Sequence, residues 1–129
     1  MVRVLVVDDD AAVRAWLRTV LADQGYEVQE APDGKVGLRL FREQPADVVL
    51  LDVLMPEQEG IETLRELRKA CPAVKVIVIS GGSSWVTQEE ALAAALDFGA
   101  LRTLAKPFSW NDLADAITAV LSPHGHPTG

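Results

Sequence analysis

The run Val48-Val49-Leu50-Leu51-Asp52 decides how this chain folds, because four consecutive apolar residues end in a carboxylate. A strand with one face in water alternates apolar and polar residues, whereas a strand covered on both faces is continuously apolar. The segment Val76-Ile77-Val78-Ile79 has the same continuous character and ends at Ser80. Both runs therefore predict interior strands of a sheet that carries helices on its two faces.

Five short segments predict strands, and segments with helical spacing separate them. The predicted strands are Val4–Val7, Glu27–Glu30, Val48–Leu51, Val74–Ile79 and Leu101–Ala105. Strands separated by helix-length segments run parallel, with right-handed crossovers. We predict an α/β fold with a doubly wound, five-stranded parallel sheet and five helices. One domain would span residues 1–121, followed by a flexible C-terminal tail at 122–129.

Helical spacing of apolar residues marks three of the connecting segments. Asp10 is interpreted as the N-cap of the first helix rather than as a metal ligand, and this helix should end near Gly25. Its predicted core-facing residues are Val13, Trp16, Leu17, Val20 and Leu21. Similar stripes are Ile61, Leu64 and Leu67 in a helix from about Glu59, and Leu113, Ile117, Val120 and Leu121 in the last helix after Ser109.

Charge and composition exclude several classes of protein. The formal net charge is -7 and no cluster of Lys or Arg stands out, so we expect no direct nucleic-acid binding. No apolar run approaches the roughly 18 to 20 residues of a membrane span, and Asp8-Asp9-Asp10 is incompatible with a signal peptide. Cys71 is the one cysteine. We therefore expect a cytoplasmic protein without membrane contact, stabilised by packing rather than by disulfides.

Polar residues follow four of the five predicted strands, namely Asp8 and Asp9, Asp52, Ser80 and Lys106. Asp and Ser are ordinary turn residues, so one alone is weak evidence. Ligands of doubly wound sheets, however, bind beyond the carboxyl ends of the strands. Three carboxylates there would repel one another by about 4 kcal/mol per pair at 4 Å, and Mg²⁺ would relieve the repulsion. An ionised Asp nucleophile with a metal, an ammonium and a hydroxyl suits phosphoryl transfer without a general base.

Four motifs together resemble the response-regulator receiver family of two-component signalling, over about residues 2 to 121. They are Val6-Val7-Asp8-Asp9-Asp10, the segment 48–60, Ile79-Ser80-Gly81 and Lys106-Pro107-Phe108. The resemblance implies a flavodoxin-like sheet with strand order 2-1-3-4-5. It also implies a signalling switch whose Asp52 is phosphorylated by the phosphohistidine of a histidine kinase or a histidine phosphotransfer protein.

The same resemblance implies roles for the residues at the strand ends. Asp8, Asp9, Asp52 and the backbone carbonyl of Leu54 would hold Mg²⁺, and Lys106 would bind the phosphoryl oxygens. The chain would not be a metabolic enzyme, because its chemistry would be limited to autocatalytic phosphorylation and self-dephosphorylation. An output partner is implied without being identified, and homodimer formation on phosphorylation is a further expectation.

Ser80 would move to hydrogen-bond the phosphoryl group, and the peptide bond before Pro107 would be cis. The sequence departs from the family pattern at Thr103, where an aromatic residue is usual, and in a longer segment after Ser80. Without a ring at Thr103, the signal is expected to pass through this segment, which contains Gly81 and Trp85. The two glycines at its start permit backbone conformations denied to other residues.

Two other functions fit part of the sequence pattern. A phosphatase or phosphotransferase of the haloacid-dehalogenase type also uses a strand-end Asp, Mg²⁺ and a lysine, but it usually has an Asp-x-Asp pattern on the first strand and a cap domain. This chain has the adjacent pair Asp8-Asp9, and its length leaves no room for a cap. A pseudo-receiver that only binds proteins is disfavoured because Asp8, Asp9, Asp52, Ser80 and Lys106 are all present.

Overall fold

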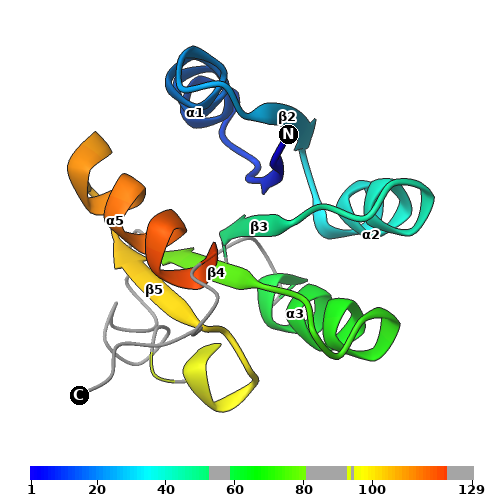
Figure 1. Cartoon of the computed structure of the whole chain (residues 1–129). Helices are drawn as coiled ribbons and strands as arrows, with labels where there is room; N and C mark the ends of the chain where they lie inside the picture. The colour runs from blue at the N-terminus through cyan, green and yellow to red at the C-terminus, as the bar shows by residue number, and fades with distance from the viewer. Residues whose placement is uncertain (53–58, 81–92, 94, 122–129) are drawn as a thin grey trace.

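The computed structural model describes residues 1–52, 59–80, 93 and 95–121. Within these ranges five strands form one parallel sheet in the order β2-β1-β3-β4-β5 (Figure 1). The strands are β1 (Arg3–Val7), β2 (Glu27–Ala31), β3 (Val48–Asp52), β4 (Val76–Ser80) and β5 (Arg102–Ala105). The predicted doubly wound sheet and its flavodoxin-like strand order are confirmed.

Helices cover both faces of the sheet. They are α1 (Ala11–Asp23), α2 (Gly34–Glu43), α3 (Glu59–Ala70) and α5 (Trp110–Leu121). Helices α1 and α5 lie on one face, and α2 and α3 lie on the other (Figure 1). Residues 93 and 95–97 are also helical. The rest of the helix expected between β4 and β5, and the expected tail at residues 122–129, fall outside the described residues.

The two faces of the sheet build two separate cores, because successive side chains of a strand point to opposite sides. Every residue of β3 and β4 is buried, as the continuous apolar runs predicted. On one face the helices contribute Leu17, Leu21, Leu113, Ile117 and Val120. On the other face they contribute Phe41, Leu64 and Leu67. None of the helices within the described ranges has the length and apolar character that a membrane crossing requires.

Helix α1 begins and ends close to its predicted limits. The Asp10 carboxylate accepts hydrogen bonds from the backbone N–H groups of Ala12 at 2.9 Å and Val13 at 3.3 Å, which confirms it as the N-cap. Gly25 follows the helix with φ of 91°, a conformation that glycine adopts at little cost. The cap fixes where the chain leaves β1, and so positions the loop that carries Asp8 and Asp9.

Two details of the sequence prediction were wrong. Trp16 was expected in the core, but the residue is 40% exposed and its ring packs against Phe108 with centroids 5.9 Å apart. Leu17 and Leu21 occupy the centre of the buried stripe, and Trp16 lies at its edge. The fourth strand was expected from Val74 but begins at Val76. The Val74 N–H donates instead to the Cys71 carbonyl at 2.9 Å, in the turn after α3.

Candidate functional site

Polar residues meet at the carboxyl edge of the sheet, where the parallel strands end. Asp8 follows β1, Asp52 ends β3, Ser80 ends β4, and Lys106 follows β5. The strand register aligns these ends, since Asp52 lies opposite Ile79 and Ser80 lies opposite Ala105. Asp8, Asp52 and Ser80 are buried, with exposed fractions of 1%, 5% and 0%. Interior strands thus hold these polar groups in fixed positions.

Asp8, Asp9 and Asp52 form an acidic cluster. Each offers a carboxylate oxygen, and the three oxygens lie within 4.8 Å of one another. Asp9 is exposed while the other two are buried, so the cluster opens to solvent on the Asp9 side. Carboxylate oxygens are the ligands preferred by hard dications such as Mg²⁺. The donor set therefore fits the metal that the sequence predicted.

Lys106 bridges the two buried members of the cluster. Its Nζ lies 3.1 Å from Asp8 Oδ2 and 3.3 Å from Asp52 Oδ2. Burial by itself would lower the pKa of Lys106, but the carboxylates of Asp52 and Asp8 outweigh that effect and raise the pKa above the ordinary lysine value. The ammonium is therefore charged at neutral pH, and it offsets part of the repulsion within the cluster.

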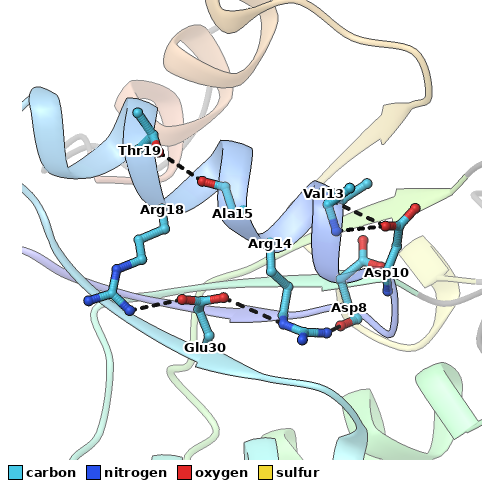
Figure 2. Close-up of polar contacts among 9 residues, drawn as sticks. Asp8, Asp10, Val13, Arg14, Ala15, Arg18, Thr19 and Glu30 are labelled. Atoms are coloured by element: carbon cyan, nitrogen blue, oxygen red, sulfur yellow. Dashed lines mark hydrogen bonds and ion pairs between the residues drawn. The ribbon is translucent and has the colours of Figure 1, made fainter.

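The main chain and side chain of Asp8 are held by several hydrogen bonds. Its N–H donates to the Ala31 carbonyl at 3.1 Å, and its Oδ1 accepts from the Asp10 N–H at 2.8 Å. Its carbonyl oxygen accepts from Arg14 Nη1 at 2.6 Å, and Arg14 also pairs with Glu30 (Figure 2). Arg14 was not identified from the sequence, because a hydrogen bond to a main-chain oxygen leaves no pattern of residue types.

The remaining predicted residues have mixed outcomes. The Lys106–Pro107 peptide bond is cis, as predicted. Thr103 lies on β5 opposite Val78 and is half-buried. Leu54, Gly81 and Trp85 lie outside the described residues.

A hollow lies beside Lys106, between α1 and the residues that follow β5. Its volume is about 530 Å³, and it is lined by Val13, Trp16, Lys106, Pro107 and Phe108. The hollow is open to solvent, and four of its five lining residues are apolar or aromatic. Trp16 is exposed because it forms part of this wall instead of the core. The hollow was not predicted, because it depends on how the residues after β5 pack against α1.

Fold and site together define a doubly wound α/β domain with an acidic, lysine-bridged pocket at the carboxyl edge of its sheet. Residues 4–118 match the model of the response regulator receiver domain. The chain therefore belongs to the response regulator receiver domain family. Domains of this family are signalling switches of two-component systems rather than metabolic enzymes.

Individual relatives agree with this assignment. The chain is 41% identical over 120 residues to the response regulator MprA of Mycolicibacterium vanbaalenii, covering 93% of this chain and 50% of that protein. It is 34% identical to the chemotaxis protein CheY of Thermotoga maritima, covering 92% of this chain and 96% of that protein. The chain thus spans about half the length of the MprA proteins it matches.

Solved structures show the same fold. A CheY-like receiver domain protein from Methanospirillum hungatei superposes with a TM-score of 0.82 at 31% identity, covering 92% of this chain and 91% of that one. The receiver domain of NtrX from Brucella abortus superposes with a TM-score of 0.84 at 28% identity, covering 92% of this chain and 97% of that one.

Proposed function

We propose that residues 1–121 form a phosphorylation switch in which Asp52 accepts a phosphoryl group in a Mg²⁺-dependent reaction. The donor would be the phosphohistidine of a histidine kinase or of a histidine phosphotransfer protein. The observation that carries the proposal is the position of Lys106 Nζ, 3.1 Å from Asp8 and 3.3 Å from Asp52 in the three-carboxylate cluster. A carboxylate nucleophile, a cation-binding acid pair and a fixed ammonium are the groups that phosphoryl transfer needs.

In the proposed step an oxygen of Asp52 forms a bond to phosphorus while the phosphorus–nitrogen bond of the phosphohistidine breaks. The imidazole leaves with the bonding electron pair and takes up a proton, and Asp52 becomes an acyl phosphate. An ionised carboxylate is itself nucleophilic, so the step needs no general base. In the second half of the cycle, water attacks phosphorus and the phosphorus–oxygen bond to Asp52 breaks with its electron pair returning to the carboxylate, while the protons of water leave with inorganic phosphate.

Asp8, Asp9 and Asp52 would hold Mg²⁺, together with the Leu54 carbonyl that the family resemblance implies. The bound dication would neutralise the charge that gathers on the phosphoryl oxygens. Lys106 is already 3.3 Å from Asp52 Oδ2, so its ammonium would donate to a phosphoryl oxygen carried by Asp52. The Ser80 hydroxyl would supply a further donor from the end of β4.

Phosphorylation would replace the single negative charge of the Asp52 carboxylate with the roughly 1.5 to 2 negative charges of a phosphoryl group and add acceptor oxygens at a buried strand end, which is the physical basis of a switch. Thr103 has no aromatic ring to carry a change along β5. We therefore assign the transmission to the segment from Gly81 to Trp85, toward a partner that remains to be identified. Homodimer formation would be one form of this output.

The test is intact-mass measurement after incubation with acetyl phosphate and Mg²⁺. The wild-type protein is expected to gain one acid-labile phosphoryl group, and Asp52→Asn is expected to gain none. Asp115→Asn is the matched control, since Asp115 is an exposed residue of α5 and should leave labelling intact. Labelling of Asp52→Asn at the wild-type level, or full labelling in excess EDTA, would refute the proposal.

A further inference from the structure

We propose that Arg14 is a positioning residue for the acidic cluster. It holds the peptide group between Asp8 and Asp9 through the Asp8 carbonyl, and thereby sets the two carboxylates in place for a divalent cation. This inference rests on the proposed function, because the cation is the one that phosphorylation of Asp52 would require.

The contact between Arg14 and Asp8 is short and partly shielded from water. Arg14 Nη1 donates to the Asp8 carbonyl oxygen at 2.6 Å, slightly shorter than the usual range for N–H···O bonds of about 2.7 to 3.2 Å. The Arg14 side chain is 18% exposed. Hydrogen bonds from a charged donor are stronger than neutral ones, and partial burial reduces competition from water. The guanidinium is thus a firm anchor for this carbonyl group.

The hydrogen bond to the Asp8 carbonyl affects the position of the Asp9 carboxylate more than that of the Asp8 carboxylate. The Asp8 carboxylate already has partners on both oxygens, namely the Asp10 N–H and the Lys106 ammonium. Asp9 is exposed, and its position depends on the direction in which the backbone presents it. The Asp8 carbonyl and the Asp9 nitrogen share one planar peptide group. Fixing that carbonyl therefore restricts the rotation of the peptide that carries Asp9.

The Glu30 carboxylate on β2 offsets the positive charge of Arg14, which would otherwise repel a divalent cation. A guanidinium beside three carboxylates would by itself repel a dication, but Arg14 Nε lies 3.5 Å from Glu30 Oε1. The other oxygen of Glu30 accepts from Arg18 Nη1 at 2.9 Å, so Glu30 is held from two sides (Figure 2). Arg14 thus orients the Asp8–Asp9 peptide group, while Glu30 offsets the charge of Arg14.

Isothermal titration with Mg²⁺ tests the role in the full chain. Arg14→Gln is expected to weaken Mg²⁺ binding about tenfold, the lower end of the effect seen when an outer-shell partner of a metal ligand is lost. Arg18→Gln is the matched control, because Arg18 is 65% exposed and contacts the same Glu30 without reaching Asp8. It should keep the wild-type affinity. Equal affinities for the two variants would overturn the inference.

Arg14→Lys keeps the positive charge but removes the guanidinium, so it distinguishes the orienting role of Arg14 from an effect of its charge. It also provides a test if Arg14→Gln fails to fold. Lysine lacks the planar guanidinium with which Arg14 presents Nη1 to the Asp8 carbonyl and Nε to Glu30, so we expect the same loss of Mg²⁺ affinity. Wild-type affinity in this variant would show that the positive charge alone suffices, and would refute the positioning role.

Phosphorylation by acetyl phosphate provides a second readout. In Arg14→Gln the Mg²⁺ concentration for half-maximal labelling rate should rise with the affinity loss, while the rate at saturating Mg²⁺ should approach that of the wild type. A fall in the saturated rate alone would refute a role in placing the cation ligands. If the wild type binds Mg²⁺ but is not labelled, the proposed function is refuted, whereas the comparison of Mg²⁺ affinities still tests the role of Arg14. A wild type that binds no Mg²⁺ would overturn both.

Discussion

Replacing Lys106 with Met tests the electrostatic balance of the site, because the variant keeps the aliphatic stem and loses only the ammonium. At 3.1 and 3.3 Å, each ion pair of Lys106 is worth about 5 kcal/mol of gross attraction at an effective dielectric of about 20. Carboxylate oxygens up to 4.8 Å apart repel one another by at least about 3 kcal/mol per pair at the same dielectric. Attraction and repulsion in the metal-free cluster are therefore of similar size.

Without the ammonium, the repulsion can be relieved by protonation of one carboxylate. Protonating an acid of ordinary pKa near 4 costs about 4 kcal/mol at pH 7 and about 1.4 kcal/mol at pH 5. We therefore expect Lys106→Met to lose about 2 to 4 kcal/mol of unfolding free energy at pH 7 in EDTA, and about 1 kcal/mol at pH 5.

The pH dependence belongs to the variant and not to the wild type. The folded-state pKa of Lys106 is raised, so its contribution is complete below the ordinary lysine pKa and is lost only as the pH rises through the raised value. In Lys106→Met a carboxyl group would have a raised pKa in the folded state. The stability of Lys106→Met should then fall as the pH rises from 5 to 7, because the folded state binds more protons than the unfolded state in this pH range.

Urea unfolding at pH 5 and pH 7, with EDTA or with Mg²⁺, is the assay. Mg²⁺ should stabilise Lys106→Met more than the wild type, because the dication takes over the neutralising role of the ammonium. The control is Lys35→Met, an exposed residue of α2 whose loss should change stability by less than about 0.5 kcal/mol. A loss of equal size at both pH values, or a smaller response to Mg²⁺ than in the wild type, would refute the balance described for the cluster.

Two further substitutions test the repulsion among the three carboxylates and the close packing of α2 against β1. Asp9→Ala should bind Mg²⁺ much more weakly by calorimetry but melt at an equal or higher temperature in EDTA, because one of three neighbouring carboxylates is gone; a lower melting temperature would show that they are not crowded. Gly37→Ala should lose about 1 to 3 kcal/mol in urea unfolding, because a Cβ there would lie 2.8 Å from Val7 Cγ2; unchanged stability would mean that β1 and α2 shift apart easily.

The strand-end residues were predictable because parallel strands all finish at one edge. Asp8, Asp52 and Lys106 each follow or end an apolar run, so the topology alone brings them together. The strand order and the cis peptide bond before Pro107 came from family resemblance, and both are confirmed.

Other parts of the site could not be predicted, for separate physical reasons. Arg14 acts on a backbone oxygen, and a sequence does not reveal which carbonyl a long side chain will reach. Trp16 fits the helical spacing of a core residue, but its ring lies at the edge of the stripe and packs on Phe108, from a different segment. Periodicity identifies the centre of a buried face better than its margins, where partners distant in the sequence decide the outcome.

The contacts of Lys106 span 98 positions to Asp8 and 54 positions to Asp52. A chain emerging from the ribosome presents both aspartates before the lysine is synthesised, and a domain generally folds as a unit. Until β5 joins the edge of the sheet, the carboxylates have no ammonium between them. The reactivity proposed for Asp52 should therefore appear only when the last strand has joined the sheet, so that an unfinished or partly unfolded chain would not compete with the folded protein for the proposed phosphoryl donor.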